Sequence, residues 1–219
     1  MGACYGDDVE RSCLKPSCEL ELKGVISLPT DLTERTIESK RVYEGRVVNL
    51  RVDTVMLPDG RISTREIVEH RGAVAIVPML SENKVILIKQ FRKPANEDLL
   101  EIPAGTLAEG ETPIECAKRE LVEEIGYSAG KFEELFSIYL APGYSTEKLH
   151  VFLASELKPE ERKLDEEEFI EVVEMTLDEA ISQIEAGAIK DAKTICGLLL
   201  TWYRLHRGSK LKAGGSSGS

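Results

Sequence analysis

The stretch that decides the fold reads Gly105-Thr-Leu-Ala-Glu-Gly-Glu111-Thr-Pro-Ile-Glu-Cys-Ala-Lys-Arg119-Glu120-Leu-Val-Glu123-Glu124-Ile-Gly126-Tyr127. Residues three and four apart share one face of an α-helix, so Glu120, Glu123 and Glu124 are expected to project together. Like charges at this spacing repel, so a purely structural helix gains nothing from them. A hard divalent cation reverses that balance, because Mg²⁺ prefers oxygen ligands and shares them with substrate phosphates.

The sequence around these acids predicts a helix with defined ends. Thr112 to Glu115 is typical of a capping box, with Pro113 at the first helical position. Gly126 can adopt the positive φ that ends a helix. Apolar residues recur at helical spacing between these ends, namely Ile114, Ala117, Leu121 and Ile125. We therefore expect one face of the helix to pack on a core and the acidic face to line a site.

Composition sets limits on the function. The chain has 219 residues, of which 42% are hydrophobic, and a formal net charge of −11. The charge argues against unspecific nucleic-acid binding, which depends on Lys and Arg, but not against a small phosphate-bearing substrate beside a metal. No apolar run is long enough to span a bilayer, and the N-terminus lacks the basic stretch followed by an apolar stretch that marks a secretory signal. We expect no nucleic-acid or membrane partner and a cytoplasmic protein.

The chain divides into four segments. Residues 1–31 are expected to be a flexible or non-native leader; three of its residues are cysteines, for which a zinc site is the alternative. Residues 32–71 predict a small antiparallel β segment, too small to bury its own core and therefore in contact with the main domain or a second subunit. Residues 72–206 form the main domain, and residues 207–219 have the composition of a flexible tail or linker.

The sequence pattern of the main domain predicts strands and helices. Strand patterns cover 73–80, 85–91, 99–102, 132–139, 149–155 and 170–175. Helical patterns begin at Leu177 and cover residues 192–206. Cys116 and Cys196 lie in predicted helices and are expected to be small buried residues. This order predicts an α/β fold with a mixed sheet.

The motif around this helix resembles the signature of the Nudix family. The pattern G-x5-E-x7-R-E-U-x-E-E-x-G-U, where U is apolar, is met at every fixed position from Gly105 to Gly126, and only Tyr127 is unusual. The resemblance implies an α/β/α sandwich and metal-dependent hydrolysis of a nucleoside diphosphate linked to another moiety. Mg²⁺ is the expected metal, with Mn²⁺ as an alternative. A solvated acidic helix is the structural alternative.

Motifs outside this box are similar to those of the ADP-ribose pyrophosphatases. They are Lys89–Arg92 before Leu100–Gly105, Ala141–Gly143, the acidic stretch Glu166–Val172, and Gly187–Thr194. The resemblance implies hydrolysis of ADP-ribose to AMP and ribose 5-phosphate by a homodimer that exchanges its N-terminal segment. A pyrophosphatase for another nucleoside diphosphate sugar, such as GDP-mannose, is the alternative enzyme. A non-catalytic ADP-ribose sensor is the alternative outside the enzyme class, and the intact box argues against it.

The resemblance also implies roles for residues of the box. Glu120, Glu124 and the backbone carbonyl of Ala104 would hold the metal. Glu123 would be a further ligand or a partner behind the ligands. Arg119 would orient the carboxylates by bidentate hydrogen bonds. Glu111, at the start of the box, is expected to close the loop through an ion pair.

Residues outside the box complete the expected site. Glu168 would be the general base, with Glu167 as the alternative and a solvated acidic loop as the structural reading. Arg92 would bind a phosphate or the terminal ribose, and Glu101 would accept hydrogen bonds from adenine or a ribose. A surface arginine and a sheet-edge carboxylate are the structural alternatives for these two. Arg65 is a weaker candidate that would reach the substrate from the N-terminal segment.

Overall fold

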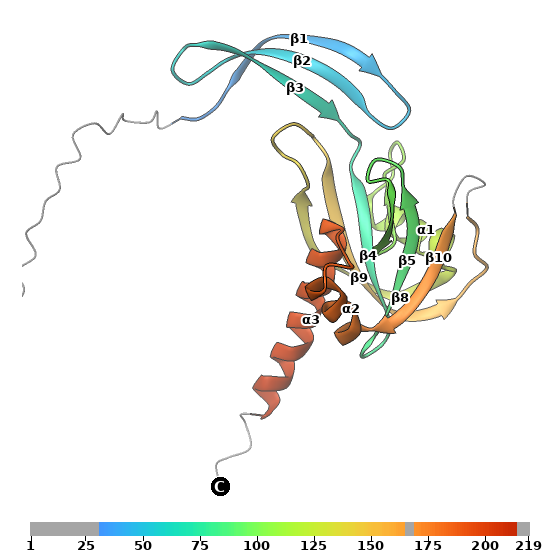
Figure 1. Ribbon diagram of the computed structural model, residues 1–219. Helices are drawn as coiled ribbons and strands as arrows, with labels where there is room; N and C mark the ends of the chain where they lie inside the picture. Colours follow the sequence, from blue (N-terminus) through green and yellow to red (C-terminus); the bar gives the residue numbers. More distant parts are fainter. Residues whose placement is uncertain (1–30, 165–168, 214–219) are drawn as a thin grey trace, which may run out of the picture.

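The structure is a computed structural model that describes residues 31–164 and 169–213 (Figure 1). The first 30 residues, with their three cysteines, lie outside the described residues, as do residues 214–219. Glu167 and Glu168 belong to the stretch 165–168, which also lies outside them. The expectations for these segments stay predictions.

The N-terminal segment forms the small antiparallel sheet that the sequence predicts. Its strands are β1 (Arg35–Glu44), β2 (Asn49–Met56) and β3 (Ile62–Glu69), in spatial order β1-β2-β3. The sheet projects from one end of the main domain (Figure 1). Besides chain continuity, it is linked to that domain by a bridge in which Val68 N–H donates to the Tyr144 carbonyl at 2.8 Å and Thr146 N–H donates to the Val68 carbonyl at 3.0 Å, and by His70 N–H, which donates to Thr146 Oγ1 at 3.0 Å. Every residue of β1 is exposed.

The main domain contains a seven-stranded sheet. Its path is β10-β5-β4-β9-β8, formed by β10 (Ile170–Thr176), β5 (Lys84–Arg92), β4 (Ala73–Ser81), β9 (Lys148–Pro159) and β8 (Tyr127–Tyr139). Two short strands extend it: β6 (Glu97–Glu101) pairs with β5, and β7 (Ala104–Thr106) pairs with β4. Strands β4 and β9 run parallel and the other pairs are antiparallel, so the sheet is mixed, as expected.

Helices cover both faces of this sheet, which confirms the α/β/α sandwich. They are α1 (Pro113–Ile125), α2 (Leu177–Glu185) and α3 (Ala192–Ala213). From β4, Val74 and Ile76 belong to the core cluster that contains Leu121 of α1. Ala75 and Val77 belong to the other cluster, which contains residues of α2 and α3. A strand buried on both faces reads as a continuous apolar run, which explains the sequence Ala-Val-Ala-Ile-Val from Ala73.

The structure also differs from the sequence predictions. Strand β8 begins at Tyr127, because it pairs with the long strand β9 as far as Pro159. Helix α3 continues to Ala213 instead of ending at residue 206. The prediction that Cys196 is buried was wrong: it is exposed, since the buried positions of α3, including Leu198 and Thr201, lie on another face of the helix. Cys116 is buried, as predicted.

Candidate active site

Helix α1 has the predicted ends and carries the acidic residues of the box. At its start, Thr112 N–H donates to the Glu115 carboxylate at 3.0 Å, and Pro113 occupies the first turn. At its end, Gly126 has φ 71°, in the left-handed region, and its N–H donates to the Val122 carbonyl at 3.0 Å. The apolar face packs on the sheet around Leu121. These contacts fix the rotation of the helix and hence the direction of its acidic face.

Arg119 joins the acids of the box into one network. Its Nε and Nη2 donate to the two oxygens of Glu111 at 2.9 and 3.0 Å, which is the expected ion pair across the loop. Its Nη1 donates to Glu120 Oε1 at 2.6 Å and to Glu123 Oε2 at 2.9 Å. The hydrogen bonds from Arg119 lower the pKa of Glu111 to about 2. Arg119 therefore donates hydrogen bonds to three carboxylates at once and stabilises the charged form of Glu111.

The backbone of β7 lies directly against the buried acids. Ala104 N–H donates to Glu124 Oε2 at 2.8 Å. A Cβ atom added at Gly105 would lie 1.7 Å from Glu120 Oε1, so only glycine leaves room for this carboxylate. Glu120 and Glu124 are buried, at 8% and 3% exposure. The structure thus brings together the three residues that the sequence proposes as metal ligands.

The chemistry of this donor set fits a hard divalent cation. Two buried carboxylates and a backbone strand that approaches within contact distance at Gly105 supply oxygen atoms, which Mg²⁺ and Mn²⁺ prefer. Over residues 31–164 and 169–213, no three Asp, Glu, His or Cys side chains are gathered closely enough to hold an ion by themselves. Mg²⁺ commonly takes one or two carboxylates and completes its shell with water and phosphate oxygens.

A second charged cluster lies where β5, β6 and the start of α3 meet. Arg92 donates from Nε and Nη2 to the two oxygens of Glu101 at 2.7 and 2.9 Å. Lys193 Nζ donates to Glu101 Oε2 and also pairs with Asp191 at 2.9 Å. Burial raises the pKa of Glu101, but Arg92 and Lys193 outweigh that effect and the net shift is downward. Four side chains therefore form one network of two cations and two anions.

Glu101 is a buried carboxylate at the end of the short strand β6, which pairs with β5. Its exposure is 1%. Both of its oxygens are engaged by Arg92 and Lys193, which makes it a support for cations in the described structure. A direct hydrogen bond from Glu101 to adenine or ribose stays a prediction. Arg92 is 40% exposed, so part of its side chain faces solvent.

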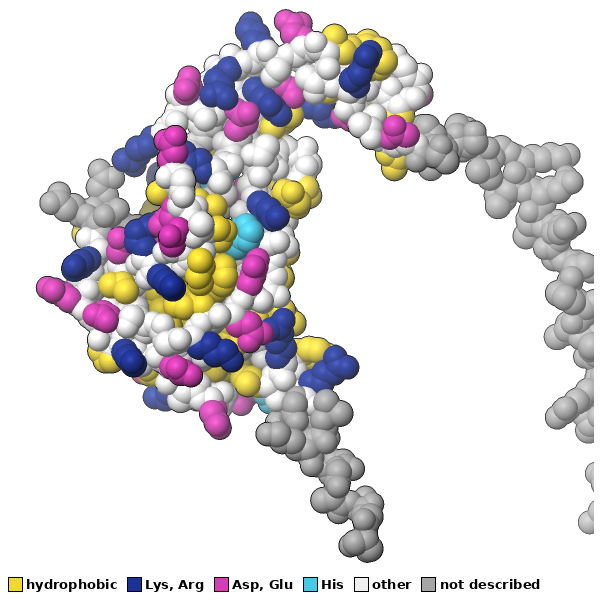
Figure 2. All heavy atoms as spheres, turned by 180° about the vertical axis from the view of Figure 1, so that it is seen from behind, with side chains coloured by type: hydrophobic (Ala, Val, Ile, Leu, Met, Phe, Trp, Pro, Cys, Tyr) yellow, Lys and Arg dark blue, Asp and Glu magenta, His cyan; other side chains and the backbone are white. Residues whose placement is uncertain are grey.

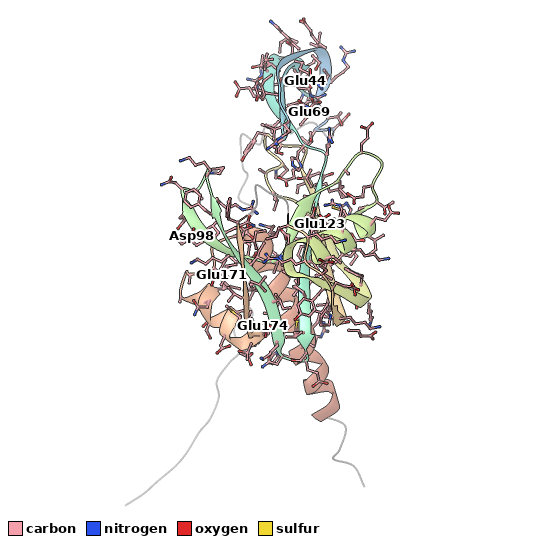
Figure 3. All side chains as sticks on the ribbon, turned by 90° about the vertical axis from the view of Figure 1, so that its right-hand side faces the viewer. Glu44, Glu69, Asp98, Glu123, Glu171 and Glu174 are labelled. Carbon is pink, nitrogen blue, oxygen red and sulfur yellow. The ribbon has the colours of Figure 1, made fainter. Side chains whose placement is uncertain are left out.

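One pocket joins the second cluster to the backbone of β7. It has a volume of about 220 Å³, and its lining includes Arg92, Asp191, Lys193, Ala104 and Gly105. In the side view of Figure 3, Glu123 lies on α1, and Asp98 and Glu171 lie on β6 and β10, which both pair with β5. The cations of the second cluster thus border the same space as the backbone that lies against Glu120 and Glu124.

Arg65 lies away from this pocket within one chain. Its Nε donates to Glu34 at 2.8 Å, and it lines a different pocket, of about 310 Å³, with Pro142 and Tyr144. Its contribution to the substrate site stays a prediction that requires a second chain. Sequence reasoning gave no role to Lys193 or Asp191, although both stand in the quoted stretch Gly187–Thr194. Two opposite charges beside the start of an otherwise apolar helix are the signal for them.

The face of the molecule seen in Figure 2 carries charges of both signs. In the view of Figure 2, dark-blue and magenta side chains alternate over the main domain and the N-terminal sheet. No helix within the described ranges has the length and apolarity needed to cross a membrane.

Comparisons with known proteins define the class of protein. Residues 69–198 match the family model described as the NUDIX domain, and residues 34–68 match the nucleoside diphosphate sugar hydrolase N-terminal domain. The chain belongs to the Nudix family, and its small sheet is the N-terminal domain found with nucleoside diphosphate sugar hydrolases. The two matches meet between Val68 and Glu69, at the end of β3.

Particular relatives narrow the comparison. The chain is 48% identical to the ADP-ribose pyrophosphatase of Bacillus subtilis (strain 168), covering 74% of this chain and 89% of the relative. It is 45% identical to the methanol dehydrogenase activator of Bacillus methanolicus, with the same coverage of 74% and 89%. It is 40% identical to the GDP-mannose pyrophosphatase of Yersinia enterocolitica, covering 65% and 78%. A solved ADP compounds hydrolase superimposes with a TM-score of 0.72 at 25% identity, covering 80% of this chain and 95% of that one.

Proposed function

We propose that this protein hydrolyses the diphosphate bond of ADP-ribose, with a divalent metal, to AMP and ribose 5-phosphate. The observation that carries the proposal is the pocket that Ala104 and Gly105, beside the acids of α1, share with Arg92 and Lys193. A pocket with these two borders suits a ligand whose diphosphate lies at the metal and whose sugar phosphate extends toward the cations. Similarity to ADP-ribose pyrophosphatases of Bacillus subtilis and Mycobacterium tuberculosis, at 48% and 38% identity, supports this substrate.

The metal would be held by Glu120, Glu124 and the carbonyl of Ala104, with Mg²⁺ as the expected ion and Mn²⁺ as the alternative. When bound, it neutralises charge on the diphosphate and polarises the phosphorus that is attacked. Arg119 would orient the carboxylates of Glu120 and Glu123 through its hydrogen bonds to them. Glu123 lies on the same face and completes the ligand set or supports it from behind.

The remaining residues bind the substrate and move the proton. Arg92 would donate to a phosphate or to the terminal ribose from the rim of the pocket. Water attacks one phosphorus, the anhydride P–O bond breaks, and the leaving phosphate keeps the electron pair. The proton of the attacking water goes to a carboxylate, for which the family resemblance favours Glu168, with Glu167 as the alternative. Both residues lie outside the described part of the chain.

A panel of substrates tests the proposal. The protein is incubated with ADP-ribose, GDP-mannose, UDP-glucose, NADH and dGTP, with and without Mg²⁺, and phosphate-containing products are identified. Metal-dependent release of AMP, preferentially from ADP-ribose, is the expected result. Preference for GDP-mannose would favour the alternative that the Yersinia relatives support. Binding of ADP-ribose without turnover of any compound would favour the sensor.

We also propose that the protein is a cytoplasmic homodimer in which the N-terminal sheet contacts the second subunit. The support is that apolar side chains of this sheet are exposed in a single chain, among them Ile37, Val42 and Tyr43 of β1. Burial of such residues favours association. This arrangement would bring Arg65 of one chain toward the site of the other. Light scattering coupled to gel filtration should give twice the chain mass. A monomer would contradict both the homodimer and the approach of Arg65 to the site of a second chain.

A further inference from the structure

We infer that Lys193 is a positioning residue that keeps Arg92 available to an anionic substrate by sharing the buried carboxylate of Glu101. The inference deepens the proposed function and rests on it only for the identity of the substrate. Lys193 lies at the start of α3 and lines the pocket together with Arg92 and the backbone of Ala104 and Gly105.

The buried carboxylate of Glu101 is shared by two cations. Its Oε1 accepts from Arg92 Nε, while its Oε2 accepts from both Arg92 Nη2 and Lys193 Nζ. The Lys193 side chain is 11% exposed and that of Glu101 is 1% exposed, so this pair is almost fully removed from water. An ionised carboxylate in such a place needs compensation from cations. Lys193 supplies part of this compensating charge, so Arg92 does not have to supply all of it.

Arg92 lines the pocket with one donor atom left for a ligand. Its side chain is 40% exposed and lines the pocket, and its Nη1 makes no hydrogen bond to any residue that the structure describes. Nη1 is therefore the donor left for a ligand. The two hydrogen bonds to Glu101 fix the plane of the guanidinium, which is the geometry that oxyanion recognition requires.

The formal charges of the second cluster balance. Arg92 and Lys193 are opposed by Glu101 and Asp191, so the network has a formal charge of zero. Removing the charge of Lys193 leaves it at minus one beside the pocket. Arg92 is then the cation of this network that remains on Glu101, and the buried carboxylate holds it more tightly. Both changes weaken binding of an anion while leaving the carboxylates of α1 in place.

The anchor of Lys193 is itself rigid. Asp191 Oδ2 accepts from the N–H and the hydroxyl of Thr194 at 2.9 and 2.6 Å. Thr194 Oγ1 in turn accepts from Ile102 N–H at 2.9 Å, next to Glu101 on the chain. The start of α3 is thus tied to the end of β6 by hydrogen bonds. Lys193 has a fixed distance to Glu101, as a positioning residue needs.

The test compares Lys193→Met and Lys193→Gln with Lys193→Arg, each with and without Glu101→Gln. Lys193→Gln keeps a hydrogen-bond donor and serves if the methionine variant does not fold. Lys190→Met is the matched control, because Lys190 is an exposed lysine three residues earlier that pairs with Glu97 at 2.6 Å. Circular dichroism verifies the fold of every variant. Two quantities are measured: kcat and KM for ADP-ribose with Mg²⁺, and the rate at which phenylglyoxal modifies Arg92 without metal or substrate, followed by peptide mass spectrometry.

We expect neutral substitutions of Lys193 to raise KM about tenfold with kcat changed less than about twofold, and to slow modification of Arg92 several-fold. Lys193→Arg and Lys190→Met should behave like the unchanged protein. In the Glu101→Gln background, replacing Lys193 should change neither quantity by more than about twofold, because the shared carboxylate charge is absent.

The inference is overturned if Lys193→Met matches Lys190→Met in both quantities. It is also overturned if the effect of Lys193 is equally large with and without Glu101, since Lys193 would then act directly. Failure of the proposed function gives a different result. In that case the unchanged protein does not turn over ADP-ribose, and the modification rates of Arg92 alone decide the role of Lys193.

Discussion

Replacing Gly105 by alanine should disable catalysis without unfolding the protein. The added Cβ would lie 1.7 Å from Glu120 Oε1, 2.0 Å from Cδ and 2.6 Å from Cγ. Ordinary contact begins at 3.4 Å, so Oε1 has to move by at least 3.4 − 1.7 = 1.7 Å. A displacement of about 1 Å in a catalytic group can cost about 100-fold in rate. We therefore expect kcat for ADP-ribose to fall by about 100-fold or more.

The fold should tolerate this change. Gly105 does not have a positive φ, and the atoms that the Cβ meets belong to the end of a flexible side chain. The free energy of unfolding should change by no more than about 1 kcal/mol. Gly143→Ala is the control, because a Cβ there meets nothing within 4 Å and the backbone is equally unstrained. Urea unfolding and a Mg²⁺ titration of kcat are measured on both variants. A folded Gly105→Ala protein with the original kcat and metal response would refute the assignment of Glu120.

Three further predictions concern single side chains. Glu124→Gln should abolish Mg²⁺-dependent turnover in a protein with an unchanged circular dichroism spectrum, and normal turnover would remove Glu124 from the ligand set. The pKa of Glu111 is lowered from 4.5 to about 2, so the stability that it contributes is present above about pH 4.5 and is lost as the pH falls toward 2. Between pH 5 and 2.5 the unchanged protein should therefore lose about 1 kcal/mol more than Glu111→Gln in urea unfolding, and parallel losses would contradict the ion pair. A maleimide should label exposed Cys196 within minutes and leave Cys116 intact, because burial raises the pKa of the Cys116 thiol to about 12; equal labelling in peptide mass spectra would contradict the packing of α1.

The box could be predicted from the sequence because its contacts are local. The cap at Thr112, the stop at Gly126 and the ion pair between Glu111 and Arg119 all join residues within one helix and its preceding loop. Helical periodicity therefore gives both the core face and the acidic face. The approach of Gly105 to Glu120 is less local, but it also falls within this stretch.

The second cluster could not be predicted in the same way. Glu101 and Lys193 are 92 positions apart, and their contact depends on how β6 and α3 meet at the sheet. Strand patterns show that Glu101 is near the end of an apolar stretch, but they do not show that it is buried. Cys196 gives a similar lesson, since the pattern of α3 is apolar on several faces and does not indicate which one meets the sheet.

The two charged clusters draw on different helix layers of the sandwich. The acids of the box come from α1, which packs with one core, whereas Lys193 comes from α3, which packs with the other. Under the proposed function, substitutions at the start of α3 should change substrate binding while the acids of α1 keep their arrangement. The start of α3 is therefore a place at which selectivity can be redesigned.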